Sequence, residues 1–272
     1  MRTIVHLSDL HFGRTYAALI EPLLATVRAS RPDCVVVSGD LTQRARPAEF
    51  RQARAFLDRL PGPQVVVPGN HDVPLYRLWE RWFDPLGNYR RFINAEIETA
   101  FIDSEIAVVG VNTARALTFK SGRINAAQID SIQRRIAALP PELTKIVVTH
   151  HPFDLPDAPG QVDLVRGARQ AMVGFARCGV DLLLAGHLHT AQAGDTSGRH
   201  ELPGYAALAV QAGTATSTRG RGETNSFNVL RIEPGAVAVE RQVWDERIGA
   251  FRLDKTEHFR RKGGRWSDFG PG

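Results

Sequence analysis

The chain has 272 residues, of which 43% are hydrophobic and 23% charged, a composition typical of a soluble globular protein with one or two domains. These values exclude a disordered, collagenous or coiled-coil chain. The formal net charge of +5 allows an anionic ligand but does not require nucleic acid, and no block of like charges forms a polybasic tail.

Cysteine content and the amino terminus bear on the compartment. The two cysteines, Cys34 and Cys178, cannot form a disulfide framework, and such low cysteine use suits a reducing compartment. The amino terminus enters an apolar strand pattern without the features of a secretory signal, and no apolar run approaches 18 residues. The sequence therefore predicts a cytoplasmic protein without a transmembrane helix.

The first third of the chain alternates short β-branched runs with longer helical patterns. Apolar runs predict strands at residues 3–7, 34–37 and 65–67. Helical spacing marks residues 16–29 and 47–60, and a proline opens the second of these helices. The order β-α-β-α-β predicts a parallel sheet with right-handed crossovers.

The rest of the chain extends this pattern. Residues 76–93, rich in Arg, Trp and Phe, predict a helical, lid-like segment. Further helices are predicted at residues 125–139 and 164–178, and further strands at residues 97–101, 106–111, 145–149, 181–184, 206–210, 226–232 and 236–243. We expect a layered α/β sandwich: one domain over residues 1–244 with a β-rich C-terminal portion, and a partly flexible extension over residues 245–272 that ends in a loosely held tail.

Polar residues of one chemical kind follow five of the predicted strands. They are Asp9-Leu10-His11, Gly39-Asp40, Gly69-Asn70-His71-Asp72, His150-His151 and Gly186-His187-Leu188-His189. In open α/β sheets, ligands bind just beyond the carboxyl ends of the strands. The first three groups are about 30 residues apart, the length of one βαβ unit, so we expect all five groups to meet at one sheet edge.

The residue types indicate a metal site. Asp, Asn and His supply mixed oxygen and nitrogen ligands, which suit Mn, Fe, Co, Ni or Zn, and the lack of nearby Cys argues against structural zinc. Seven donors are too many for one tetrahedral ion but fit two ions that share a carboxylate, an arrangement that acts on phosphorus. Each motif alone is a weak signal. His6, His200 and His258 match no such pattern and are predicted to be ordinary structural or surface histidines.

Together these motifs resemble the complete signature of the calcineurin-like metallophosphoesterase superfamily, and the chain is most similar to bacterial class III cyclic-nucleotide phosphodiesterase-like proteins. The superfamily resemblance spans Asp9 to His189, and the similarity to the class III proteins is supported by residues 69–74, residues 150–152 and a late segment of residues 213–217 and 225–228. It implies an αββα sandwich of two mixed β-sheets flanked by helices. It also implies two divalent or trivalent transition-metal ions (Mn, Fe, Zn, Co or Ni).

The resemblance assigns a role to each motif residue. It implies that Asp9, His11 and His189 bind one metal, that Asn70, His150 and His187 bind the other, and that Asp40 bridges the two. A hydroxide shared by the ions would attack phosphorus in line. His71 would donate a proton to the leaving oxygen, and Asp72 would orient His71 through its other ring nitrogen.

The substrate is less well defined by the sequence. Arg219 and Arg221, in a Gly-rich segment, are candidates for binding a phosphate, although such arginines are more often solvated loop residues. We expect a small phosphodiester substrate such as a cyclic nucleotide. A homodimer is plausible from the resemblance, with the C-terminal β segments as its interface.

Three other functions use the same fold. A DNA nuclease usually carries further capping segments and a clustered basic face, which this chain does not show, so a nucleic-acid partner is not expected. A lipid-linked nucleotide pyrophosphatase needs a membrane-facing amphipathic lid, and residues 75–93 are a faint candidate for one. A non-catalytic binding module would have lost a ligand or His71, and all of these residues are present.

Overall fold

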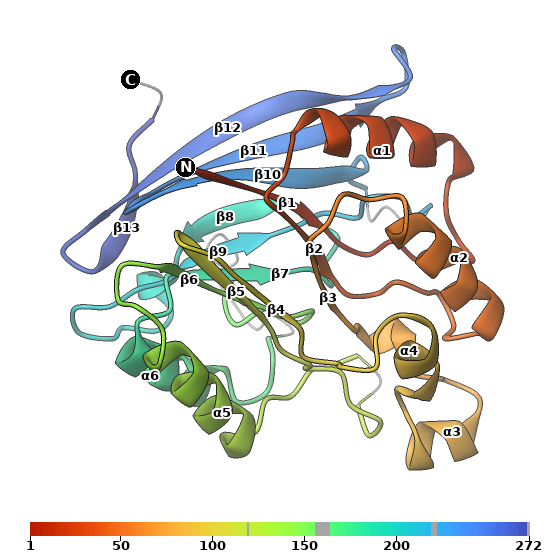
Figure 1. Ribbon diagram of the computed structural model, residues 1–272, viewed down its shortest axis with the longest axis horizontal. Coiled ribbons are helices and arrows are strands. Elements are labelled where there is room, and N and C mark those ends of the chain that lie inside the picture. Colours follow the sequence, from red (N-terminus) through yellow and green to blue (C-terminus); the bar gives the residue numbers. More distant parts are fainter. Residues whose placement is uncertain (119, 156–163, 219–221, 271–272) are drawn as a thin grey trace.

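The computed structural model describes residues 1–118, 120–155, 164–218 and 222–270, and it contains two β-sheets packed face to face (Figure 1). The first sheet has seven strands in the order β13-β12-β11-β10-β1-β2-β3. These strands are β1 (Arg2–Leu7), β2 (Cys34–Ser38), β3 (Gln64–Val67), β10 (Ser226–Glu233), β11 (Ala236–Asp245), β12 (Ala250–Lys262) and β13 (Arg265–Asp268). Strands β1, β2 and β3 are parallel, whereas the pairs from β1–β10 to β12–β13 are antiparallel.

The second sheet has six strands in the order β4-β5-β6-β7-β9-β8. These strands are β4 (Ala100–Ile102), β5 (Ile106–Gly110), β6 (Thr144–Val148), β7 (Leu182–Ala185), β8 (Gln192–Asp195) and β9 (Leu208–Gln211). Its central strands β5, β6, β7 and β9 are parallel, and β4 and β8 pair antiparallel at the two edges. Both sheets are therefore mixed, as the resemblance implied.

Helices cover the outer face of each sheet. The described helices are α1 (Ile20–Ala29), α2 (Pro47–Leu57), α3 (Leu78–Phe83), α4 (Gly87–Phe92), α5 (Ala126–Ala137) and α6 (Ala168–Cys178), with 3-10 turns η1 (Ala17–Leu19), η2 (Asn70–Asp72) and η3 (Thr196–Gly198). The helices α1, α2 and α4 belong to the first sheet, and α5 and α6 to the second (Figure 1). Among the described residues, no helix is long and apolar enough to cross a bilayer.

Local sequence explains where the main helices begin. Pro47 is the first residue of α2, and the Glu49 carboxylate accepts a hydrogen bond from the Arg46 backbone N–H, which caps that end. Asn125 caps α5 by accepting a hydrogen bond from the Gln128 backbone N–H. Each helix then turns an apolar face toward its sheet.

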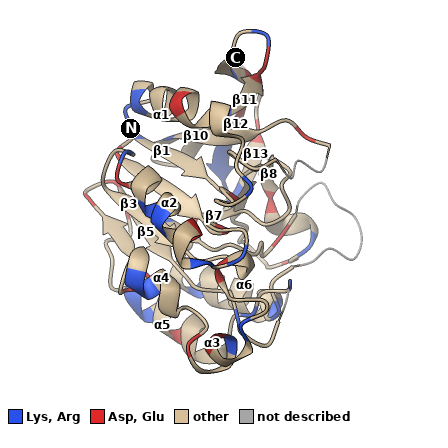
Figure 2. Cartoon of the chain, turned by 90° about the vertical axis from the view of Figure 1, so that its right-hand side faces the viewer, with Lys and Arg blue, Asp and Glu red and all other residues tan. Residues whose placement is uncertain are grey.

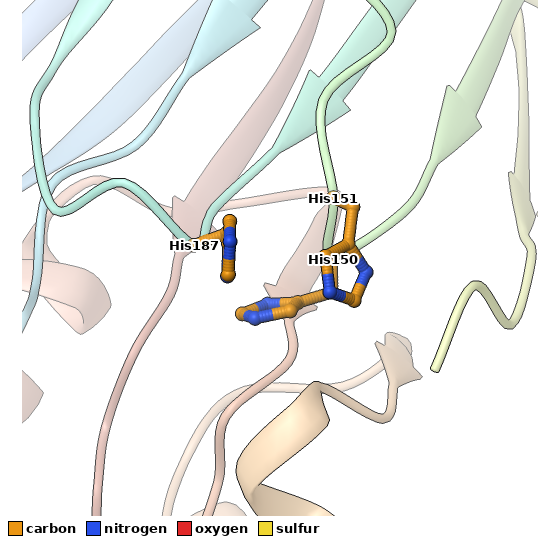
Figure 3. A group of neighbouring side chains, drawn as sticks. All are labelled: His150, His151 and His187. Atoms are coloured by element: carbon orange, nitrogen blue, oxygen red, sulfur yellow. The ribbon is translucent and has the colours of Figure 1, made fainter. Parts of the chain in front are cut away.

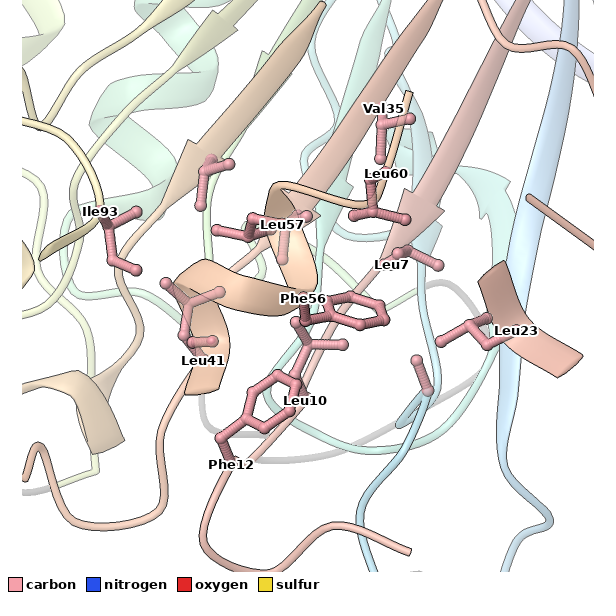
Figure 4. Packing of buried hydrophobic residues seen from close by; sticks show 14 of the residues in the cluster. Leu7, Leu10, Phe12, Leu23, Val35, Leu41, Phe56, Leu57, Leu60 and Ile93 are labelled. Carbon is pink, nitrogen blue, oxygen red and sulfur yellow. The ribbon is translucent and has the colours of Figure 1, made fainter. Parts of the chain in front are cut away.

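Three buried clusters fill the spaces between these layers. One lies between the two sheets and includes Ile4, Val36, Ile146 and Leu184. A second cluster joins the first sheet to α1, α2 and α4 and includes Leu7, Leu23 and Phe56 (Figure 4). A third cluster joins the second sheet to α5 and α6. Burial of this apolar surface is the main force that holds the four layers together. It also fixes the strand ends that carry the polar motifs.

The C-terminal part differs from the sequence expectation. The boundary expected after residue 244 falls within β11, and residues 250–262 and 265–268 form two further strands of the first sheet. Residues 265–268, expected in a loosely held tail, pair with β12 as β13. The backbone hydrogen bonds of this ribbon bind the extension to the sheet.

Candidate metal centre

The seven predicted metal ligands converge at the carboxyl ends of β1, β2, β3, β6 and β7. Ligand atoms of Asp9, His11 and His189 lie within 4.8 Å of one another, as do those of Asp9, Asp40 and His150. The two groups share Asp9, so they form one continuous cluster. The seven donors come from five strand ends in two different sheets, β1–β3 in the first and β6 and β7 in the second. The expectation that they meet at the edge of one sheet is therefore wrong, and the face-to-face packing of the two sheets brings them together.

The Asp9 group is closely packed. The Nε2 atoms of His11 and His189 are 3.3 Å apart, and Oδ1 of Asp9 lies 3.1 Å from His189 Nε2 and 3.6 Å from His11 Nε2. All three side chains are buried. Oδ2 of Asp9 accepts hydrogen bonds from the Ser8 hydroxyl and the His187 backbone N–H, at 2.6 and 2.9 Å, which leaves Oδ1 facing the two histidines.

The second group gathers around Asp40. Nε2 of His150 lies 3.3 Å from Asp40 Oδ1 and 3.1 Å from Asn70 Oδ1. The other nitrogen of His150, Nδ1, donates to the Ser38 carbonyl oxygen at 2.8 Å, so Nε2 is the nitrogen left for a ligand. The His150 and His187 rings meet at 5.1 Å between centroids. Oδ2 of Asp40 also lies 3.7 Å from His11, so Asp40 stands between the two groups.

Five of these residues have a left-handed backbone conformation. Their φ angles are 53° at Asp9, 49° at His11, 51° at Asp40, 78° at His187 and 63° at His189. Such angles are rare outside glycine, and they store strain where the surrounding structure holds them. The hydroxyl of Thr214 donates to the Asp9 carbonyl oxygen at 2.7 Å, one of the contacts that fix this backbone.

Two glycines of the motifs are required by close approach. A Cβ atom on Gly69 would overlap the Asp40 carboxylate, and one on Gly186 would overlap the Ser8 hydroxyl. A larger residue at either position would push a strand end away from the cluster. The glycines in the Gly-Asn-His-Asp and Gly-His motifs therefore set how closely the ligands can gather.

Charges within the cluster are strongly coupled. Burial opposes ionisation of Asp9 and of Asp40, but the neighbouring histidines outweigh it and hold the pKa of each carboxyl below its ordinary value. Burial likewise opposes charging of His150, but the Asp40 carboxylate raises its pKa to about 9. Two buried carboxylates among several histidines need positive charge nearby, which protons supply in the metal-free chain.

The donor set fits transition-metal ions. Oδ1 of Asp9 is a buried side-chain atom without a well-aligned hydrogen bond, and it faces Nε2 of His11 and Nε2 of His189. Mixed carboxylate, amide and imidazole ligands suit Mn, Fe, Co, Ni or Zn. Residues that could hold metal ions are therefore present, and their chemistry does not select one metal from this series.

His71 lies at this cluster, but its partner differs from the expectation. Ligand atoms of His71, Asp40 and His11 lie within 4.8 Å of one another. Nδ1 of His71 donates to the Gln43 carbonyl oxygen at 2.9 Å, in the place expected for Asp72. The expected Asp72–His71 orientation is thus corrected: a backbone carbonyl, which no sequence motif marks, orients the ring.

Asp72 instead braces the strand ends. Its carboxylate accepts hydrogen bonds from the backbone N–H groups of Leu41, Thr42 and Gly69 at 2.8–3.1 Å and from the Thr42 hydroxyl. Burial, together with the charge of Asp40, raises the pKa of Asp72 to about 6. These contacts join the loop after β2 to the loop after β3, so Asp72 positions Asp40 and Asn70 from behind.

His151 is adjacent to the cluster, and both of its nitrogens are already used. Nε2 donates to the Lys120 carbonyl oxygen and Nδ1 accepts from the Thr113 hydroxyl, both at 2.9 Å. Its ring packs 4.6 Å from that of His187, as Figure 3 shows. Burial holds the pKa of His151 well below its ordinary value, so it stays neutral. We conclude that His151 supports the cluster and the loop above it.

Sequence reasoning missed several supporting residues. Gln43, Thr113 and Thr214 act through backbone or hydroxyl contacts that leave no motif, although Thr214 lies in a segment that supported the resemblance. The predicted phosphate ligands Arg219 and Arg221 lie outside the described residues. His6, predicted to be structural, is fully buried in β1, 2.9 Å from the Ser38 hydroxyl.

Comparisons with known proteins agree with this geometry. Residues 2–191 match the family model described as calcineurin-like phosphoesterase. The chain is 28% identical over 258 residues to a cAMP/cGMP dual specificity phosphodiesterase of Mycobacterium tuberculosis, covering 86% of this chain and 77% of that protein. It is 27% identical over 249 residues to the 3′,5′-cyclic adenosine monophosphate phosphodiesterase CpdA of Escherichia coli K12, covering 85% of this chain and 82% of that one.

Solved structures share the fold at low identity. A purple acid phosphatase from yellow lupin superposes with a TM-score of 0.70 at 12% identity, over 94% of this chain and 53% of that one, so the chain spans about half the length of that enzyme. A dimetal phosphatase from Danio rerio superposes with a TM-score of 0.63 at 15% identity, over 88% of this chain and 95% of that one. These similarities establish the layered fold.

Proposed function

Because the chain belongs to the calcineurin-like phosphoesterase family, and is therefore a metal-dependent phosphoric ester hydrolase, we propose that it is a dinuclear phosphodiesterase of small substrates such as cyclic nucleotides. The observation that carries the proposal is the convergence of seven donors from five strand ends. The phosphodiesterases of M. tuberculosis and E. coli support the substrate class.

The proposed ligand sets follow the two groups of side chains. Asp9, His11 and His189 hold one ion, Asn70, His150 and His187 hold the other, and Asp40 serves both. When bound, the ions would lower the pKa of water toward neutrality and neutralise the charge of a phosphate group. The chain supplies this geometry with strand ends fixed by the buried core, so little reorganisation is needed on binding.

His71 is the proposed general acid. Its Nδ1–H is held by the Gln43 carbonyl oxygen, so a second proton on the protonated ring sits at Nε2. The Asp40 carboxylate lies on the cluster side of His71. Nε2 can then give its proton to the oxygen that leaves phosphorus. Asp72 acts in this scheme as a positioning residue.

A substrate panel tests the proposal. Metal-stripped protein with added Mn²⁺ is assayed on bis(p-nitrophenyl) phosphate, p-nitrophenyl phosphate, 2′,3′- and 3′,5′-cyclic AMP, and single-stranded DNA. We expect metal-dependent turnover of the diester and of a cyclic nucleotide, with little on the monoester or DNA. Preference for DNA would replace the proposal with a nuclease. Asn70→Ala should lose one metal and most activity, whereas Asn94→Ala, an exposed asparagine, should keep both.

One observation favours a second candidate, hydrolysis of a lipid-linked nucleotide pyrophosphate. The helix α3 exposes Trp79, Trp82 and Phe83 at 78%, 63% and 76% of their surface. Tyr76, which precedes α3, accepts a hydrogen bond from Arg44 at 2.8 Å, and the neighbouring Gln43 contacts His71, so the segment that leads into α3 is joined to the His71 side of the metal centre. Such a patch could hold acyl chains.

The same panel separates this second candidate. A lipid-linked pyrophosphate is added as a further substrate, and Trp79→Ala/Trp82→Ala should slow its turnover while cyclic-nucleotide turnover stays unchanged. Equal effects on both substrates would remove this candidate. The expected cytoplasmic location and homodimer stay predictions.

A further inference from the structure

A cavity of about 740 Å³ lies apart from the predicted metal ligands. Its described lining comes from residues 85, 86 and 90 in and just before α4, and from residues 97, 112, 114–118, 123, 125 and 166. A volume of this size is in the range of small-molecule sites, roughly 300–1,000 Å³. No predicted metal ligand lines it, so the cavity is not the mouth of the metal centre.

The charge of this cavity is one-sided. Four arginines line it (Arg90, Arg115, Arg123 and Arg166), and no carboxylate is among its described lining residues. Arg90 is paired with Asp84, so its charge is already balanced. In Figure 2, basic segments lie around α3, α4 and α5. The other three arginines carry the argument.

Arg123 and Arg166 form the centre of the proposed site. They pair across an isolated parallel bridge, and the backbone N–H of Arg166 donates to the Gly122 carbonyl oxygen at 2.9 Å. Residues paired in this way are about 4.8 Å apart and direct their side chains to the same face. Within the described residues, neither guanidinium has a hydrogen bond or an ion pair with a protein group.

Arg115 adds a third, partly buried charge. Its guanidinium donates only to neutral oxygens, those of the Asn112 and Ala114 carbonyls and of the Gln128 side chain. Burial lowers the pKa of Arg115, as does the charge of Arg123, while Glu98 opposes this. Oε1 of Glu98 accepts hydrogen bonds from the Asn112 backbone N–H and the Gln128 side chain, so it is engaged elsewhere.

Arg123 and Arg166 are exposed and Arg115 is partly buried, so the cavity gathers positive charge that a bound anion would neutralise. Arginine is suited to this role because its planar fork binds phosphate through two hydrogen bonds. The remaining lining is largely apolar, including Leu86, Ile97 and Leu117. We propose that this cavity binds a phosphate-bearing small molecule with an apolar body, about the size of a nucleoside monophosphate, and that Arg123 and Arg166 clamp its phosphate.

The site is connected to the metal centre through one loop. Asn112 and Ala114 line the cavity, and Thr113 between them donates to His151, which packs against His187. The backbone N–H of Arg123 also donates to the Thr113 carbonyl oxygen at 3.0 Å. A ligand held by Arg123 is therefore connected to the metal centre through the loop of residues 112–114, which contacts His151.

Binding to metal-free protein tests this proposal independently of catalysis. Full-length protein is stripped of metal, dialysed free of chelator and titrated at low salt with 5′-AMP, inorganic phosphate and adenosine by calorimetry. We expect 5′-AMP to bind more tightly than phosphate, and adenosine not to bind. Adenosine binding as tight as that of 5′-AMP, or 5′-AMP binding no tighter than phosphate, would overturn the assigned ligand class.

Paired variants separate the clamp from general charge. Arg123→Gln/Arg166→Gln should weaken 5′-AMP binding at least tenfold, and Arg123→Lys/Arg166→Lys should recover only part of it because the fork is lost. Arg134→Gln/Arg135→Gln removes the same charge from the exposed face of α5 and should change affinity less than twofold. Equal loss in the two Gln pairs, or no loss in either, would overturn the proposed site.

Discussion

The metal centre and the C-terminal strands β10–β13 both contain residues with a left-handed backbone conformation, but the residue types at these positions differ. In the ribbon of β10–β13, the residues with positive φ are the turn glycines Gly235, Gly249, Gly263 and Gly264. At the metal centre, the residues with positive φ include two aspartates and three histidines that are predicted ligands. Glycine adopts this conformation at little cost, whereas other residues store strain.

This difference shows what the two regions are built to do. The turns between these strands use glycine, which suits the backbone conformation and contributes no side chain. The strand ends at the metal centre keep carboxylates and imidazoles where glycine would be easier for the backbone, because the chemistry needs those donors. Strain is tolerated there because the packed layers and contacts such as that of Thr214 hold it.

We expect the largest effect from a substitution of Asp40, the residue proposed to serve both metal ions. Asp40→Asn removes the charge between the two ligand groups, which stabilises a phosphoryl transition state by several kcal/mol, so diester hydrolysis should fall about 10³-fold. Metal analysis should show fewer than two ions per chain. Asp58→Asn, a surface aspartate paired with Arg54, is the matched control and should retain metal and activity. Full activity in Asp40→Asn would refute the role of the strained cluster.

A smaller effect is expected when proton delivery alone is removed. His71→Gln should keep both ions and slow hydrolysis of 3′,5′-cyclic AMP about 10²-fold, the usual contribution of a general acid. The loss should shrink for bis(p-nitrophenyl) phosphate, because p-nitrophenolate leaves without a proton. Steady-state rates on the two substrates, with metal content measured in parallel, check this. An equal loss on both substrates would contradict the general-acid role.

A third prediction concerns the pH dependence of stability that His6 in β1 produces. Burial lowers the pKa of His6, within β1, to about 3 from 6.5. The folded chain thus keeps His6 neutral while the unfolded chain protonates it, so stability is full above pH 6.5 and falls as the pH drops toward 3. The slope is about 1.4 kcal/mol per pH unit.

Urea unfolding of metal-free protein between pH 7 and pH 5 measures this slope. The pH slope of the unfolding free energy should be smaller by about 1.4 kcal/mol per pH unit in His6→Gln. His258→Gln replaces a histidine on β12 and should have the slope of the wild type. Because Asp72, with its pKa raised to about 6, adds a slope of opposite sign, only the difference from the wild type is decisive. An unchanged slope in His6→Gln would show that His6 is not held neutral.

The smallest effect is expected in the ribbon. Gly235 has φ 70° and open space where a Cβ atom would lie, so Gly235→Ala costs only the left-handed conformation, about 1 kcal/mol. Thermal unfolding should show a decrease of about 2–4 °C without loss of phosphodiesterase activity. Gly198→Ala, with equal space and no positive φ, should change stability by less than about 0.5 kcal/mol.

The sequence by itself predicted the candidate ligands and determined most of the strands around them. Apolar runs such as Cys34-Val35-Val36-Val37 are long enough to be recognised as buried strands, and the polar residues at their ends follow directly. The boundaries of α2 and α5 also had local signals, a proline and an asparagine cap. These features depend on neighbours in the chain, which is why they could be read without a structure.

Only the tertiary structure decided the features that depend on distant partners. The strand β12 exposes most of its side chains and has no apolar periodicity, so its place in the sheet comes from backbone pairing with β11. The partner of His71 is a backbone carbonyl of Gln43, and every residue has such a carbonyl. The pairing of Arg123 with Arg166 joins residues 43 positions apart. Contacts of this kind arise when layers pack, so no local sequence pattern encodes them.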